Sequence, residues 1–151
     1  YKDPYADVLM GLTANLRYKQ FDLSVVSRAS IGNYSYNQMS ASSNLSQITN
    51  LSRLSNVHQD YLDTGFLFFS DKNTVSDHYI QNASFFRLDN ITLGYTFENA
   101  IQDNPLRIYL TGDNLFVATN YNGIDPEITG GIDSNFYPRS RAIALGLDLT
   151  F

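Results

Sequence analysis

Hydrophobic and polar residues alternate along five stretches of this 151-residue chain. A period of two places successive side chains on opposite faces, so each stretch is predicted to be a β-strand with one apolar face. The last stretch shows the pattern most regularly, because large apolar residues occupy every second position from Ile143 to Phe151. The five stretches are residues 7–18, 21–31, 84–97, 106–116 and 141–151.

Only Lys19 and Gln20 separate the first two stretches, and this spacing predicts a tight antiparallel hairpin. If Tyr18 pairs with Phe21, polar residues oppose polar residues across the hairpin and apolar residues oppose apolar ones. Lys-Gln is a poor pair for a type I′ turn, so the pattern predicts the pairing and leaves the turn type open.

The connections between the predicted strands alternate in length. Residues 33–80 form a long segment rich in Ser and Asn, residues 98–105 form a short link rich in turn formers, and residues 118–138 form a second long segment. Apolar residues recur at every third position between Leu45 and Val57, which is compatible with either a short helix or an irregular loop. Alternating short turns and long loops are typical of transmembrane β-barrels.

Aromatic residues gather at the predicted strand ends, where barrels carry interfacial girdles. The girdle beside the short turns would comprise Tyr18, Phe21, Tyr95, Phe97 and Phe151. The girdle beside the long loops would comprise Tyr34, Tyr36, Phe116, Phe136 and Tyr137.

Together these patterns predict an all-β fold, an antiparallel transmembrane β-barrel segment of about five strands with two long external loops. The alternative is a soluble all-β sandwich. The residues expected to face lipid are Leu12, Leu16, Leu23, Val25, Ile91, Leu93, Ile108, Leu110, Ile143, Leu145, Leu147 and Leu149. The residues expected to face the lumen are Asn15, Arg17, Asp22, Ser24, Arg28 and Asp148. Single-chain barrels need about eight strands to close, so either several copies share a barrel or the chain is part of a longer polypeptide.

Composition excludes several classes of protein. The net charge of −5 leaves no basic stripe for nucleic acid. The absence of cysteine excludes disulfides and thiolate metal sites. No apolar run reaches the roughly 18 residues of a membrane-spanning helix, and the first residues do not resemble a signal peptide.

Motifs for catalysis are not found, so an enzyme is not expected. Neither His58 nor His78 has a partner at metal-binding spacing, and no nucleophile or phosphate-binding motif occurs. The acidic residues Asp125, Glu127 and Asp133 could hold Ca²⁺ through their carboxylates, although a solvated loop is the simpler interpretation. No other cofactor is expected.

Four segments resemble, in the same order, the C-terminal region of SusC/RagA-type TonB-dependent outer-membrane transporters. They are residues 84–97 (SFFRLDNITLGYTF), 111–116 (TGDNLF), 121–127 (YNGIDPE) and 146–151 (GLDLTF). The hairpin at residues 18–22 also fits, so the resemblance spans nearly the whole chain, although it is weak within residues 33–80.

The resemblance implies that residues 1–151 are the C-terminal part of a single barrel domain of about 22 strands, with the plug domain and the earlier strands outside this chain. It implies TonB-dependent import of glycans or peptides across the bacterial outer membrane. The implied partners are a SusD-like lipoprotein lid, TonB through parts not in this chain, the barrel-assembly machinery, outer-membrane lipid and the remaining strands of the barrel. The alternative is a soluble all-β module, at the cell surface or secreted, that binds glycans.

Recognition residues accumulate in loops on a rigid scaffold, so contacts to ligand or partner are expected in the two long loops. The candidates are Tyr121, Asp125, Glu127, Phe136 and Tyr137.

The resemblance also implies that the last strand carries the recognition mark for the barrel-assembly machinery, on Leu147, Leu149 and Phe151. These three residues share one face, and an unpaired strand can be bound by strand addition while pockets read alternate side chains. The simpler alternative is that Phe151 only anchors the strand at the membrane interface.

Overall fold

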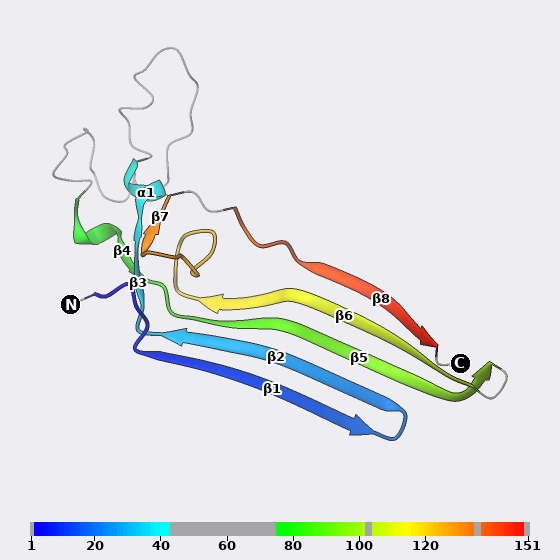
Figure 1. The fold of residues 1–151 in the computed structure, drawn as a ribbon. Helices are drawn as coiled ribbons and strands as arrows, with labels where there is room; N and C mark the ends of the chain where they lie inside the picture. Colours follow the sequence, from blue (N-terminus) through cyan, green and yellow to red (C-terminus); the bar gives the residue numbers. More distant parts are fainter. Residues whose placement is uncertain (1, 43–74, 102–103, 135–136, 150–151) are drawn as a thin grey trace, which may run out of the picture. The chain divides into compact units, whose positions relative to one another are not determined.

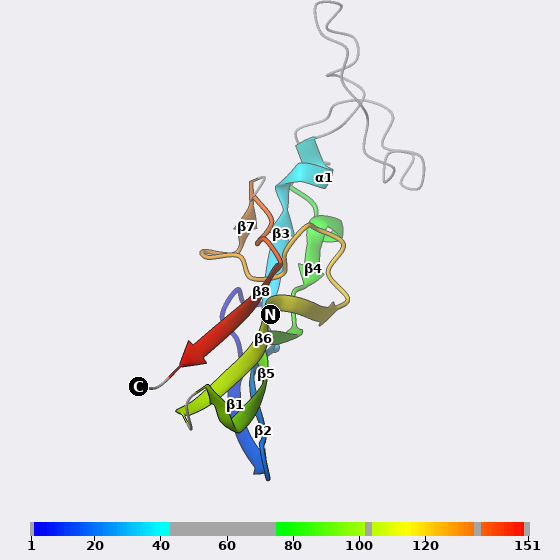
Figure 2. The same cartoon turned by 90° about the vertical axis from the view of Figure 1, so that its right-hand side faces the viewer.

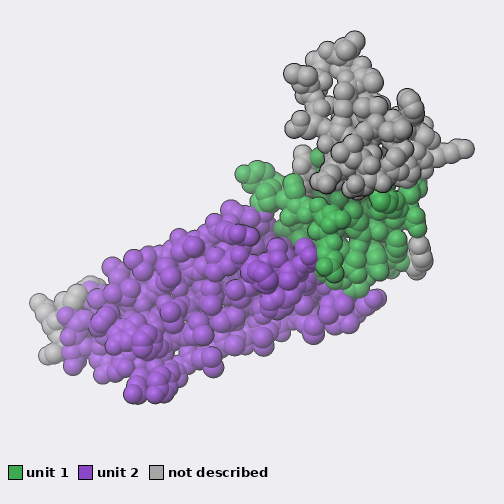
Figure 3. Space-filling view, turned by 180° about the vertical axis from the view of Figure 1, so that it is seen from behind, with its two compact units in different colours: residues 1–6, 32–84, 120–138 green, residues 7–31, 85–119, 139–151 purple. Residues whose placement is uncertain are grey.

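The structure is a computed structural model that describes residues 2–42, 75–101, 104–134 and 137–149. The chain divides into two compact units, coloured separately in Figure 3, and each has its own sheet. Unit 1 comprises residues 1–6, 32–84 and 120–138, and unit 2 comprises residues 7–31, 85–119 and 139–151. The expectation of a single barrel domain over residues 1–151 stays a prediction.

Unit 2 is a five-stranded antiparallel sheet in the order β1-β2-β5-β6-β8 (Figures 1 and 2). Its strands are β1 (Val8–Tyr18), β2 (Phe21–Ile31), β5 (Phe85–Ile101), β6 (Asn104–Thr119) and β8 (Ala142–Leu149). All five strands predicted from the alternating pattern are therefore confirmed. The sheet is open, with β1 and β8 at its two edges.

The β1–β2 hairpin has the predicted register, with Tyr18 opposite Phe21. Lys19 adopts a φ of 54°, the left-handed conformation found in tight hairpin turns. The carbonyl oxygen of Gln20 accepts a 2.9 Å hydrogen bond from the backbone N–H of Thr96, which ties the turn to β5.

The predicted link at residues 98–105 is wrong, because β5 and β6 continue into it and Ile101 pairs with Asn104. Alternation marks a strand only where one of its faces is apolar. Residues 98–100 (Glu-Asn-Ala) do not continue the apolar side of β5, so the end of the strand cannot be read from the pattern although the pairing goes on.

A bulge interrupts the pairing of β5 with β6 beside Asn114, which has a φ of 51°. Its side-chain oxygen accepts a 2.6 Å hydrogen bond from Nη1 of Arg87, and its amide nitrogen donates to the carbonyl oxygen of Arg139 at 3.1 Å. The bulge therefore ties β5 to the segment that leads into β8.

Unit 1 contains a small sheet in the order β4-β3-β7, in which β3 pairs antiparallel with β4 and parallel with β7. Its elements are β3 (Tyr34–Asn37), α1 (Gln38–Ser42), the 3-10 helix η2 (Asp77–Tyr79), β4 (Ile80–Asn82) and β7 (Ile132–Asp133). The two segments predicted as long loops thus pair with each other. Tyr36, expected in an interfacial girdle, instead belongs to β3 and packs edge-on against Tyr79.

The helix considered between Leu45 and Val57 lies outside the described residues. Among the residues that the structure describes, no helix has the length and apolar character needed to cross a membrane.

Candidate functional site

Apolar side chains form rows across the five-stranded sheet. One row consists of Leu16, Leu23, Leu93, Leu110 and Leu145. The next row toward the hairpin turn consists of Tyr18, Phe21, Tyr95, Ile108 and Leu147. We call this side of the sheet the apolar face. The pairing confirms that the residues predicted to face lipid share it.

The apolar face is exposed in this chain. The exposed fractions are 63% for Leu16, 72% for Leu145 and 68% for Leu147. A contiguous apolar surface of this kind is typical of a membrane or partner contact rather than of a soluble module.

The opposite side of the sheet, which we call the polar face, carries an ion pair between strands that are not neighbours. Nε and Nη2 of Arg107 on β6 donate to Oδ1 and Oδ2 of Asp22 on β2, at 2.9 and 2.6 Å. The pair crosses β5 at Gly94, where a Cβ atom would lie 2.7 Å from Nη2 of Arg107. The side chains can meet because residue 94 has none.

Tyr109 extends this arrangement toward β8. The guanidinium carbon of Arg107 lies 4.8 Å from the centroid of the Tyr109 ring, and the ring occupies the space that a Cβ of Gly146 would need. We call Asp22, Arg107 and Tyr109, with Gly94 and Gly146, the polar strip. It runs across the strands and fixes the orientation of a carboxylate, a guanidinium and a phenol ring.

A second hydrogen-bonded group lies on the polar face between β5 and β6. Nδ2 of Asn90 donates to Oγ1 of Thr111 at 3.0 Å and to Oδ1 of Asp113 at 2.7 Å. The hydroxyl oxygens of Thr92 and Thr111 lie 2.8 Å apart.

The side chains of Asp22 and Arg107 remain 22% and 29% exposed, so the polar face can also hydrogen-bond to a polar surface or solute.

The polar face is suited to binding and positioning. In the described ranges, no three His, Cys, Asp or Glu side chains are grouped so that they could hold a metal ion. Sequence reasoning placed Asp22 on the polar side of its strand, as the structure does, but missed its pairing with Arg107. The signal was Gly94, because a glycine inside a strand often marks a close approach of other groups.

The loop candidates lie in unit 1, and several of them are used within it. Tyr121 is only 5% exposed, and its hydroxyl donates to Oδ2 of Asp133 at 2.8 Å. Burial, together with the Asp133 carboxylate, raises the pKa of Tyr121. Asp125 is buried, and its Oδ1 accepts a 2.9 Å hydrogen bond from the backbone N–H of Glu127.

Tyr137 is 90% exposed, whereas Phe136 lies outside the described residues. The role of these residues in ligand or partner contacts, and a Ca²⁺ site at the acidic loop, stay predictions. Leu147 and Leu149 lie on β8, and Phe151 lies outside the described residues, so the assembly mark also stays a prediction.

Comparison with known proteins shows similarity to several TonB-dependent receptors. TonB-dependent receptor SusC of Bacteroides thetaiotaomicron is 42% identical over 159 aligned residues, which cover 100% of this chain and 16% of SusC. TonB-dependent receptor P3 of Formosa agariphila is 27% identical over an alignment that covers 99% of this chain and 17% of the length of P3. No family model matches the chain.

Solved structures give the same fold. The RagAB peptide importer in its closed-closed and open-open states matches with TM-scores of 0.75 and 0.72, at 24% and 23% identity. Each match covers 99% of this chain and 18% of the solved chain. The chain therefore spans less than a fifth of the length of the proteins that it resembles.

Proposed function

Because the chain belongs to the SusC/RagA-type family of TonB-dependent receptors of the bacterial outer membrane, we propose that it forms part of the barrel wall of a nutrient importer. The observation that carries the proposal is the 42% identity to SusC over the whole chain. The relatives are receptors and importers rather than enzymes.

The two faces of the unit 2 sheet fit this role. Lipid offers no hydrogen bonds, so a barrel wall presents apolar side chains to lipid and polar ones to its lumen. The apolar face, with Leu16, Leu145 and Leu147, then faces lipid, and the polar strip faces the lumen. The free edges of β1 and β8 pair with the remaining strands of the same barrel, because an unpaired edge in lipid is costly.

Substrate and partner follow from the resemblance. The importer takes up glycans or peptides with energy supplied through TonB, which contacts parts of the protein outside this chain. The segments at residues 33–80 and 118–138 lie on the extracellular side, where they meet a SusD-like lipoprotein that acts as a lid. Similarity to the RagAB peptide importer and to SusC supports a two-component, TonB-dependent system.

Deletion of the gene for the full-length protein tests the proposal. The mutant should lose growth on one class of polymeric nutrient, either a glycan or a peptide mixture, and keep growth on the corresponding monomers. Complementation should restore growth only in cells with functional TonB, and a SusD-like lipoprotein should co-purify with the tagged protein in detergent. Unchanged growth on all polymers, or release of the protein into buffer without detergent, would contradict the proposal.

A further inference from the structure

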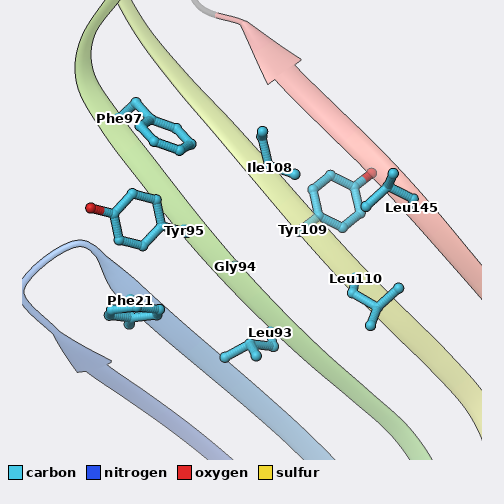
Figure 4. Close-up of a pocket in the computed structure, with 9 residues that line it drawn as sticks. All are labelled: Phe21, Leu93, Gly94, Tyr95, Phe97, Ile108, Tyr109, Leu110 and Leu145. Atoms are coloured by element: carbon cyan, nitrogen blue, oxygen red, sulfur yellow. The ribbon is translucent and has the colours of Figure 1, made fainter.

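A shallow hollow of about 270 Å³ lies on the apolar face, close to the β1–β2 turn (Figure 4). Its aliphatic lining includes Leu93 on β5, Leu110 on β6 and Leu145 on β8, which are paired across the sheet. Because these residues belong to the lipid-facing side of an outer-membrane protein, the hollow opens toward hydrocarbon.

Three aromatic side chains form the rim of the hollow nearest the turn, and Figure 4 shows them on β2 and β5. The rings of Phe21 and Tyr95 meet edge to face with their centroids 4.7 Å apart. Those of Tyr95 and Phe97 meet in the same way, also at 4.7 Å. Edge-to-face contacts hold the rings in fixed orientations, so the rim does not simply collapse into the hollow.

A cation lies on the same side of the sheet as the hollow. Nζ of Lys19 is 5.5 Å from the centroid of the Tyr18 ring, and Tyr18 belongs to the apolar row of Phe21 and Tyr95. The neighbouring cations lie on the polar face. Arg17 stands opposite Asp22 in the β1–β2 pairing, and Arg107 forms the ion pair with Asp22. An apolar hollow with an aromatic rim and a positive charge beyond the rim matches an acyl chain attached to an anionic headgroup.

We propose that the hollow binds one acyl chain of a glycerophospholipid whose phosphate is held by Lys19. The short turns of outer-membrane barrels lie at the periplasmic side, where the leaflet consists of glycerophospholipids. Lysine beside such a surface attracts anionic headgroups. The hollow is therefore a phospholipid site at the inner leaflet rather than a site for lipid A.

Photo-crosslinking in the full-length protein tests this inference. The protein is placed in nanodiscs of phosphatidylethanolamine and phosphatidylglycerol that contain a trace of phosphatidylglycerol with a diazirine in one acyl chain. Mass spectrometry then maps the label after irradiation. We expect several-fold more label around Tyr95 and Phe97 than around Leu12, which is 61% exposed on the same face but outside the hollow.

Variants separate the site from ordinary lipid contact. Leu93→Phe fills the hollow and should remove most of this excess label, whereas Leu12→Phe should leave it unchanged. Lys19→Gln should lower it about fivefold, the change expected when one lysine near an anionic surface contributes about 1 kcal/mol. Leu145→Phe is a second filling variant, and heat-modifiable gel migration confirms that each variant is folded.

Uniform labelling of the apolar face, or excess label that survives both filling variants, would overturn the site. Displacement of the label by lipid A and not by phosphatidylglycerol would overturn the assignment to phospholipid. Full labelling of Lys19→Gln would overturn the role of the lysine. The inference rests on the outer-membrane location and not on the transported nutrient, so a failed uptake experiment leaves it standing.

Discussion

Replacing Gly94 with alanine should break the ion pair that crosses β5. The new Cβ would overlap Oδ1 of Asp22 and lie 2.7 Å from Nη2 of Arg107, so at least one side chain must move. Hydrogen bonds to charged groups contribute about 1.5–3 kcal/mol each, but partial exposure of both side chains reduces this, and we expect the broken pair to cost about 1–3 kcal/mol. Alanine regains about 0.5–1 kcal/mol of backbone entropy, so the net loss is about 0–2.5 kcal/mol.

Gly11→Ala is the matched control, because Gly11 also lies within a strand and a Cβ there meets nothing within 4 Å. It should be neutral or stabilising by about 0.5–1 kcal/mol. Denaturant unfolding of the full-length protein, followed by heat-modifiable gel migration, measures both variants. In an Asp22→Ala background most of the extra cost of Gly94→Ala should disappear, because the ion pair is already lost and the released Arg107 side chain can move away from the new Cβ. Equal effects of the two glycine substitutions in the wild-type background would refute the reasoning.

Three further predictions concern single side chains. Leu145→Arg should destabilise the barrel by about 2–4 kcal/mol, whereas Ala144→Arg on the adjacent polar-face position should cost far less; equal losses in the same unfolding assay would contradict the assignment of faces. Tyr121→Phe should destabilise unit 1 by about 1–2 kcal/mol through loss of the hydrogen bond to Asp133, detected as faster hydrogen exchange around β7, while Tyr137→Phe should have no effect. The pKa of Tyr121 is raised above its ordinary value of 10.0, so the contribution of Tyr121 to the free energy of unfolding should be complete below about pH 10 and decline as the pH rises toward the folded-state pKa. The difference in absorbance at 295 nm between wild type and Tyr121→Phe follows ionisation of this tyrosine. Ionisation near pH 10 would contradict the prediction.

The strands of unit 2 could be predicted because each has one apolar face. Leu16 and Leu23 pair in the predicted register, and a slip by one residue would move every leucine of the strand to the polar face. The ion pair between Asp22 and Arg107 could not be predicted, since alternation does not specify which strand lies two places away. Gly94 was the one local sign that something crosses the strand there.

The small sheet of unit 1 left no periodic signal to read. Its strands β3 and β7 are four and two residues long and lie far apart in the sequence. The backbone N–H of Tyr36 and the side-chain hydroxyl of Ser35 donate to the carbonyl oxygen of Gly131, at 2.8 and 3.2 Å, and neither contact requires an alternating apolar pattern. Tyr121 was predicted to be a loop contact, yet it is buried. Position within a loop does not determine whether a side chain is buried.

The ion pair between Asp22 and Arg107 also has a consequence for the order of folding. Arg17 stands opposite Asp22 within the β1–β2 hairpin, whereas Arg107 lies 85 residues from Asp22 in the sequence and on a strand separated from β2 by β5. We expect a contact between residues so far apart in the sequence to form late, and therefore to contribute little to the transition state for assembly and mainly to the barrier against unfolding. Loss of the pair should shorten the lifetime of the assembled barrel while the rate of its formation stays nearly constant.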